Sequence, residues 1–168
     1  MRKMAVKKMS LGQNVLWLAV SIGFCQCAGA IGSIFTMPSI ASWYAFLAKP
    51  FFTPPNWLFG PVWITLYTLM GVALFLVWKK AKPSALREKA LKVFAVQLVL
   101  NTLWSIVFFG AHRLWSGFLV IVFLWAFILW SILLFYKIDK RAAWLLVPYL
   151  ASWVTIATLL NLGVALLN

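Results

Sequence analysis

The sequence predicts an all-α integral membrane protein, a bundle of five transmembrane helices with a cytoplasmic N-terminus and the C-terminus outside. Of its 168 residues, 65% are hydrophobic and only 10% are charged. Ordinary soluble proteins are roughly half apolar and about a quarter charged, so this composition excludes a typical soluble domain. The length fits one domain, residues 1–168, which could hold about five spans of ~20 residues each.

Five apolar runs supply the spans. None of them carries a Lys, Arg, Asp or Glu well inside its limits. Each run is long enough to cross a hydrocarbon layer of about 30 Å as a helix, and no period-2 alternation suggests a barrel strand. The predicted spans are residues 11–35, 57–78, 89–110, 114–136 and 142–166.

The basic residues predict the orientation. Thirteen of the fifteen Lys and Arg fall before the first span or in the second and fourth loops, which lie on one side of a five-span chain. Only Lys49 and Arg113 fall on the other side. Loops rich in Lys and Arg remain in the cytoplasm, so the net charge of +13 is explained by topology and by anionic lipid headgroups without a nucleic-acid partner.

The N-terminus allows a second interpretation. Basic residues, an apolar stretch and small residues at 27–30 together resemble a secretory signal peptide, and its cleavage would leave four spans. The apolar stretch continues through Ile34, beyond the usual 7–15 residues of a signal peptide. That length favours a retained first helix.

The loop between the first two spans, residues 36–56, is long, apolar and rich in aromatic residues and proline. Such a loop should pack on the bundle, either as a lid over its outer mouth or as an interfacial belt in which Trp43, Tyr44 and Trp57 lie at headgroup level. Its length favours the lid, because loops above about 12–15 residues in compact domains tend to be functional or disordered.

Three spans carry polar or aromatic residues at a spacing of four, which places them on one helix face. Exposure of Asn or Gln to lipid is costly, so these faces should point inward. They could supply interhelical hydrogen bonds, or they could line an aromatic pocket for a flat ligand. The three sets are Phe59, Trp63 and Tyr67; Gln97, Asn101 and Ser105, with Trp104 and Phe108 nearby; and Trp153, Ala157 and Asn161.

The first span contains small residues at the same spacing, including Cys25, Gly29 and Ser33. Small side chains let helices approach closely, either inside the bundle or at a dimer interface. The cysteines, Cys25 and Cys27, lack the spacing of a redox or metal motif.

Catalytic motifs are missing from the sequence. It has no acid–base pair, phosphate loop or metal-ligand cluster, so we expect no catalytic residues, no metal site and no required cofactor. An ion-coupled pump would normally need a carboxylate inside the membrane, and the spans have none. His112, in the third loop, is expected to be a solvated residue, with haem ligation as the alternative.

Taken in order, these motifs resemble the TspO/MBR family, the tryptophan-rich sensory proteins and translocator proteins. The resemblance covers the chain from Gly29 to Asn168. It rests on Gly32-Ser33, Phe35-Thr36, Trp43-Tyr44, Leu47-x-Lys49-Pro50, Thr53-Pro54-Pro55-x-Trp57, Phe59-Gly60-Pro61-x-Trp63, Leu66-Tyr67, Gln97-Leu98, Leu100-Asn101-x-x-Trp104-Ser105, Phe108-Phe109-Gly110, Pro148-Tyr149-Leu150 and Leu160-Asn161.

The resemblance implies a homodimeric five-helix protein in which the first loop closes a pocket for porphyrin, haem or a similar tetrapyrrole. It implies a membrane receptor or binding protein, in the inner membrane of a bacterium, with a role in tetrapyrrole transport or in stress regulation. The alternative is an exporter or translocator of small hydrophobic metabolites. The implied ligand-binding residues are Tyr44, Pro54, Trp63, Asn101, Trp104, Trp153 and Ala157.

Two positions depart from the family pattern. Five residues separate Pro148 from Trp153, one more than usual, and a π-bulge or a shifted proline kink near Ala151-Ser152 could absorb the extra residue. The C-terminal stretch also lacks the Tyr and following Lys or Arg of the sterol-recognition segment in animal members, so high-affinity sterol binding is not expected.

Overall fold

The computed structural model describes residues 10–80 and 83–168, and every regular element in these ranges is helical. Five segments are long and apolar enough to cross a membrane. This confirms the prediction of a five-span helical membrane protein. The observed segments are Leu11–Ala41, Asn56–Lys80, Ala85–Gly110, Leu114–Ile138 and Lys140–Leu167.

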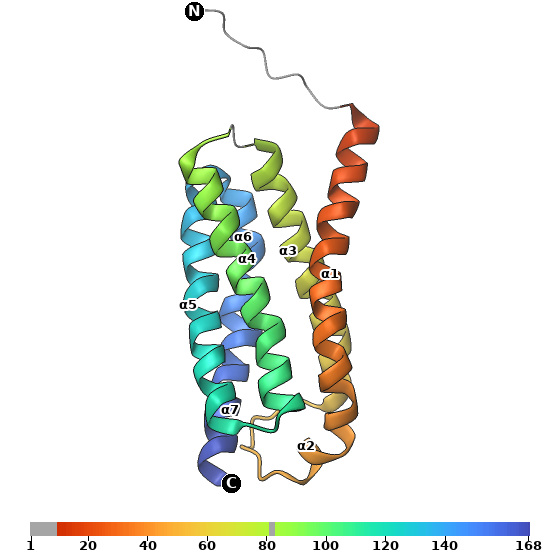
Figure 1. The fold of residues 1–168 in the computed structure, drawn as a ribbon, viewed down its shortest axis with the longest axis vertical. Helices are drawn as coiled ribbons and strands as arrows, with labels where there is room; N and C mark the ends of the chain where they lie inside the picture. The colour runs from red at the N-terminus through yellow and green to blue at the C-terminus, as the bar shows by residue number, and fades with distance from the viewer. Residues whose placement is uncertain (1–9, 81–82) are drawn as a thin grey trace, which may run out of the picture.

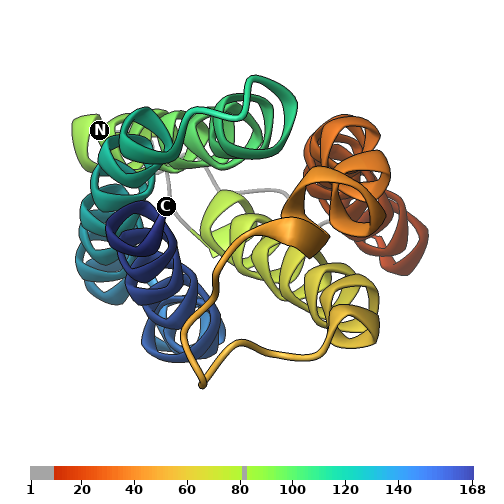
Figure 2. The ribbon, with the colours of Figure 1, turned by 90° about the horizontal axis from the view of Figure 1, so that it is seen from below.

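The helices run along the long axis of the molecule and join at two ends (Figure 1). At one end lie the start of α1, the end of α3, the start of α4 and the α5–α6 turn; we call this the basic end. The chain from Ser42 to Pro55, including the short helix α2 (Trp43–Phe46), crosses the opposite end, as Figure 2 shows; we call this chain the lid and this end the lid end. The main helices are α1 (Leu11–Ala41), α3 (Phe59–Lys80), α4 (Ala85–Ser105), α5 (Leu114–Ile138), α6 (Lys140–Pro148) and α7 (Thr155–Leu167).

Helix α1 is longer than the sequence predicts, because it passes through Pro38 and ends at Ala41 rather than at residue 35. Proline removes one helical hydrogen bond. Two hydroxyls bond to carbonyls near this point: Ser42 donates to the carbonyl of Pro38 at 2.7 Å, and Ser39 donates to the carbonyl of Phe109 at 2.6 Å. The second bond ties the end of α1 to the neighbouring span, so the lid begins later than predicted.

Small residues on α1 pack inside the bundle. A Cβ at Gly29 would lie 2.4 Å from the ring of Tyr67 on α3, and one at Gly32 would lie 3.1 Å from Oγ of Ser105 on α4. Thr102 of α4 also donates to the carbonyl of Ala28 at 3.1 Å. Of the two uses predicted for this stripe, these residues serve close helix packing within one chain.

Two π-helical segments interrupt the spans, η2 (Ile106–Gly110) and η3 (Tyr149–Val154). A π-turn holds one more residue than an α-turn and often occurs at functional sites. Segment η3 begins directly after Pro148 and contains Trp153. The predicted π-bulge therefore accommodates the extra residue between them.

The described basic residues lie where the charge count places them. Eight are at the basic end, while Lys49 and Arg113 are at the lid end. The eight are Lys79, Lys80, Arg87, Lys89, Lys92, Lys137, Lys140 and Arg141. Arg2, Lys3, Lys7, Lys8 and Lys82, which the prediction also used, lie outside the described residues.

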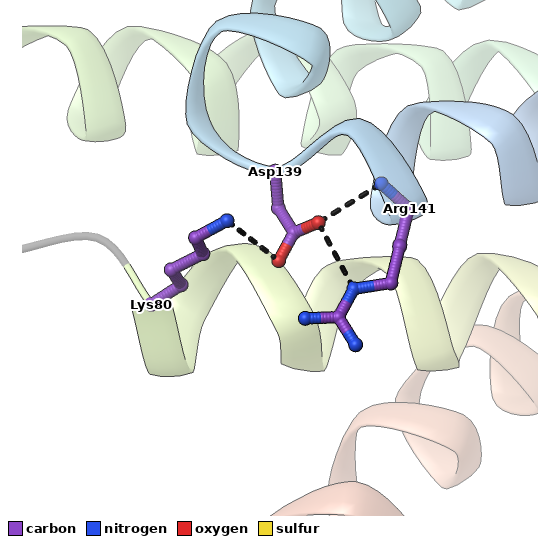
Figure 3. Close-up of polar contacts among 3 residues, drawn as sticks. All are labelled: Lys80, Asp139 and Arg141. Carbon is purple, nitrogen blue, oxygen red and sulfur yellow. Dashed lines mark hydrogen bonds and ion pairs between the residues drawn. The ribbon is translucent and has the colours of Figure 1, made fainter.

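Asp139 closes the α5–α6 turn at the basic end (Figure 3). Its carboxylate is only 4% exposed, accepts from the backbone N–H of Arg141 at 2.9 Å and pairs with Nζ of Lys80 at 3.2 Å. Burial raises the pKa of Asp139, but the Arg141 backbone bond and the Lys80 ammonium outweigh that effect, so the pKa lies below its ordinary value. One side chain thereby caps α6 and holds α3 against it.

Candidate ligand-binding site

An apolar cavity lies beneath the lid, where the lid meets the outer ends of the helices. Its walls come from the lid, α3, α4, η2, η3 and α7, so every part of the bundle except α1, α5 and α6 contributes a side chain. The lining residues are Tyr44, Pro54, Phe59, Trp104, Phe108, Phe109, Trp153, Ile156, Ala157, Leu160 and Asn161.

The cavity is nearly closed in this structure. About 360 Å³ inside its boundary is free of atoms, but the centre of a water-sized sphere can occupy only about 20 Å³. That is room for roughly one water molecule, whereas small-molecule sites usually measure about 300–1,000 Å³. A ligand of ordinary size can therefore enter only if the lid or the lining side chains move.

Six aromatic rings line the cavity and contact one another. Trp104 stacks on Phe108 with ring centroids 5.5 Å apart, and Phe59 meets Trp153 edge-on at 5.3 Å. Neighbouring π-turns hold several of these rings: Phe108 and Phe109 lie in η2 and Trp153 in η3. The result is a set of apolar faces suited to a flat ring.

Tyr44 of the lid contributes a buried tyrosine to the cavity lining. The residue is 1% exposed, and its hydroxyl has no hydrogen-bond partner among the described residues. Burial raises the pKa of Tyr44 to about 12, so the hydroxyl keeps its proton at neutral pH and can donate. A buried polar group without a partner costs about 1–3 kcal/mol, and a ligand acceptor would remove that cost.

Specific contacts hold the lid against the bundle. The side-chain amide of Asn168 bonds both ways to the backbone of Ala48, accepting at 3.1 Å and donating at 3.0 Å. A Cβ at Gly163 on α7 would lie 2.4 Å from Cγ of Pro50, so the glycine lets the lid rest on the helix. These contacts favour the closed lid.

A second group of contacts orders the turns of the lid. Nζ of Lys49 donates to the carbonyls of Tyr44, Ala45 and Leu47 at 2.7–3.1 Å, and it lies 4.9 Å from the centroid of the Tyr44 ring. Trp43 stacks on His112 with centroids 4.3 Å apart. His112 has a φ of 55°, so the third loop adopts a strained turn to make this contact.

Five of the seven predicted ligand-binding residues line the cavity together: Tyr44, Pro54, Trp104, Trp153 and Ala157. Trp63 and Asn101 are not part of its lining. Trp63 lies behind Trp153, with ring centroids 6.3 Å apart.

Asn101 is engaged in interhelical hydrogen bonds. Its Oδ1 accepts from the hydroxyl of Tyr67 at 3.0 Å, and its Nδ2 donates to the hydroxyl of Tyr149. On α7, Oδ1 of Asn161 accepts from the indole N–H of Trp104 at 3.1 Å. The two Asn side chains of the inward-facing stripes therefore join helices, while Phe59 and Trp153 of the same stripes line the cavity.

Six residues that line the cavity were not among the ligand-binding residues predicted from the sequence. Phe59 and Asn161 belonged to the inward-facing stripes and Phe108 lay beside one, so their spacing could have included them. The others occur on or next to spans interrupted by π-segments, where a strict spacing of four no longer predicts which face a side chain occupies. The six are Phe59, Phe108, Phe109, Ile156, Leu160 and Asn161.

Within the described residues, no group of three or more His, Cys, Asp or Glu side chains could hold a metal ion.

Comparison with known proteins shows the family of the chain. The sequence profile of the TspO/MBR family matches residues 21–167. The chain belongs to the TspO/MBR family.

Individual TspO/MBR relatives match over most of their length. The chain is 44% identical to a "Tryptophan-rich protein TspO" from Archaeoglobus fulgidus, over 92% of this chain and 99% of the relative. It is 44% identical to "Protein CrtK" from Rhodobacter capsulatus, over 89% and 91%. It is 38% identical to the human "Translocator protein", over 78% of each chain.

Proposed function

We propose that this TspO/MBR protein is a membrane receptor that binds a tetrapyrrole, porphyrin or haem, in the cavity beneath the lid. The observation that carries the proposal is Tyr44, which lines a cavity walled by aromatic rings and whose buried hydroxyl has no partner in the described part of the chain. Such a site suits a ligand that is flat and apolar over most of its area and has a hydrogen-bond acceptor at its edge.

A tetrapyrrole has these properties, because its ring is flat and aromatic and its propionates are charged acceptors. In the proposed complex, Trp104 and Trp153 contact the ring, and the Tyr44 hydroxyl donates to a propionate. Nζ of Lys49 lies 4.9 Å from the ring of Tyr44 and adds positive charge near that acceptor. Asn101 acts behind the cavity wall, where it holds Tyr67 and Tyr149 in place.

We also propose which side of the membrane the cavity faces and that the receptor is a homodimer. Positive residues at the basic end favour its placement in the cytoplasm, which puts the lid and the cavity on the outer side of a bacterial inner membrane. There, a homodimeric receptor would capture tetrapyrroles for transport or for regulation of a stress response. The protic groups in the cavity lining belong to Tyr, Trp and Asn side chains, which supports binding rather than catalysis.

A translocator of other small hydrophobic metabolites is the second candidate, favoured by the name of the human relative, "Translocator protein". The same apolar cavity would serve it. Reconstituted vesicles distinguish the two: a translocator moves a hydrophobic dye or porphyrin across the bilayer at a rate proportional to the number of protein copies, whereas a receptor only retains it.

The test of the binding site is a fluorescence titration of the purified protein with protoporphyrin IX. Ala157→Phe, which fills the cavity, should abolish binding, and Trp153→Leu should weaken it about tenfold, since an aromatic contact contributes about 0.5–1.5 kcal/mol beyond area burial. Trp63→Phe should have a smaller effect, because Trp63 lies behind the lining.

Trp144→Phe is the matched control, since Trp144 is exposed on α6 and lies outside the cavity. It should bind like the parent. Unchanged binding by Ala157→Phe in a protein that remains folded would refute the assignment of the cavity.

A further inference from the structure

A second apolar hollow lies at the other end of the bundle, on the flank of α1. It is larger than the lid cavity: the centres of water-sized spheres can occupy about 260 Å³ of it, against about 20 Å³ under the lid. We call it the α1–α4 groove. Its walls include Trp17, Val20, Ser21 and Phe24 of α1, Trp78 of α3 and Leu91 of α4.

The groove arises because α1 and α4 separate toward the basic end (Figure 1). Near the lid end they are in contact, through the Thr102–Ala28 hydrogen bond and the close approach of Gly32 to Ser105. Farther along, α1 stays on α3, since Trp17 and Trp78 lie with ring centroids 4.8 Å apart, but α4 no longer reaches α1. Residues of α1 at spacings of three and four thus present an apolar face that none of the described helices covers: Trp17 is 41% and Phe24 57% exposed.

An unpaired cation lies next to the groove. The guanidinium carbon of Arg87 is 5.8 Å from the centroid of the Trp78 ring, and its Nε is buried with no hydrogen-bond partner in residues 10–80 and 83–168. Glu88 and Asp139 are the two acidic residues of the chain. Glu88 pairs with Lys92 at 2.6 Å, and Asp139 with Lys80 and Arg141. No acid of this chain therefore neutralises Arg87.

We propose that the α1–α4 groove binds one anionic phospholipid, with an acyl chain between α1 and α4 and the phosphate on Arg87. The apolar wall suits a hydrocarbon chain, and a guanidinium fork matches phosphate oxygens in two parallel hydrogen bonds. Charge complementarity selects an anionic lipid over a second copy of this chain, whose exposed cations at the same end would repel Arg87. The proposal is independent of ligand binding under the lid.

Native mass spectrometry in mild detergent measures the site directly. With palmitoyl-oleoyl-phosphatidylglycerol, we expect one lipid to be retained at a concentration at least fivefold lower than with palmitoyl-oleoyl-phosphatidylcholine, since one basic residue near an anionic lipid contributes about 1 kcal/mol. Glycerol phosphate, the headgroup without its chains, should not compete. Equal retention of the two lipids, or competition by glycerol phosphate, would overturn the proposal.

Three variants locate the lipid. Arg87→Gln should remove the preference for phosphatidylglycerol, and Ser21→Phe, which fills the groove, should remove retention of both lipids. Lys89→Gln is the matched control, because Lys89 lies on the same helix but over the ring of Trp130, outside the groove lining. An effect of Lys89→Gln as large as that of Arg87→Gln would mean diffuse attraction to the basic end and would refute a specific site.

A measurement on the unaltered protein guards against a variant that fails to fold. In phosphatidylcholine nanodiscs, a low fraction of phosphatidylglycerol with dibrominated chains should quench tryptophan fluorescence more than the same fraction of dibrominated phosphatidylcholine. Trp17→Phe should reduce that difference, since its ring lines the groove. Equal quenching by the two lipids contradicts the proposal.

Discussion

The amide of Asn168 gives a quantitative test of whether the lid must open for a ligand. In the closed structure this side chain makes two hydrogen bonds to the backbone of Ala48, at 3.1 and 3.0 Å. The cavity beneath has room for about one water, so a tetrapyrrole can bind only after the lid moves and these bonds break. We call these two Asn168–Ala48 hydrogen bonds the latch. Their free energy stabilises the closed lid and therefore opposes ligand binding.

Asn168→Ala removes both bonds. A hydrogen bond contributes about 0.5–1.5 kcal/mol net, and the exposed position of this pair places it at the low end, or about 1 kcal/mol for the two. Removing that cost should tighten protoporphyrin binding about fivefold. The gain should appear in the association rate, with little change in the dissociation rate, because the latch is present only before binding.

Stopped-flow fluorescence with protoporphyrin IX separates the two rates. Leu167→Ala is the control, because it shortens an exposed neighbouring side chain that makes no latch. Unchanged or weaker affinity in Asn168→Ala would show that the lid keeps this contact in the complex, and the reasoning from cavity size would then be wrong.

Three further predictions follow from named contacts. Gly163→Ala, whose Cβ would lie 2.4 Å from Pro50, should displace the lid and accelerate porphyrin association as Asn168→Ala does; an unchanged rate in stopped flow contradicts this. Asn101→Ala leaves the hydroxyls of Tyr67 and Tyr149 without their amide partner, so it should destabilise the fold by about 1–3 kcal/mol, seen as a lower thermal midpoint in detergent, whereas equal midpoints would refute the role. The pKa of Asp139 is lower in the folded protein than in the unfolded chain, so its ionised form stabilises the fold above the unfolded pKa of about 3.9, and this stabilisation is lost as the pH falls through the folded pKa. Asp139→Asn should therefore lower the thermal midpoint at pH 7 and lower it much less at the acid limit. An equal loss at both pH values would contradict this assignment.

Much of the fold could be predicted because lipid leaves few alternatives for the backbone. Helices must satisfy their own hydrogen bonds there, so apolar length alone located all five spans. The sequence prediction was wrong about where α1 ends: it placed the end at residue 35, whereas the helix continues to Ala41. Pro38 predicts a helix stop in water, but α1 continues through it to Ala41, and the hydroxyl of Ser39 bonds to the carbonyl of Phe109 in another span.

The candidate site could be predicted in part. A spacing of four correctly placed Trp153 and Ala157 on an inward face, and the lid residues entered through the family resemblance. Residue spacing predicts only that Asn101 lies on an inward helix face. It does not predict that the side chain bonds to Tyr67 and Tyr149 rather than lining the cavity, since both lie inward. The spacing placed Trp104 and Phe108 near the inward face of the third span, but it did not include Phe109, because η2 shifts the helical phase there.

The most direct test of the central claim pairs Tyr44→Phe with a ligand that lacks the matching group. Protoporphyrin IX carries propionates, and its dimethyl ester does not carry their charge. A hydrogen bond to a charged acceptor contributes about 1.5–3 kcal/mol, so Tyr44→Phe should weaken protoporphyrin binding by about 10- to 150-fold while changing ester binding far less. Equal losses for the two ligands, or no loss for either, would contradict a tetrapyrrole held by the Tyr44 hydroxyl.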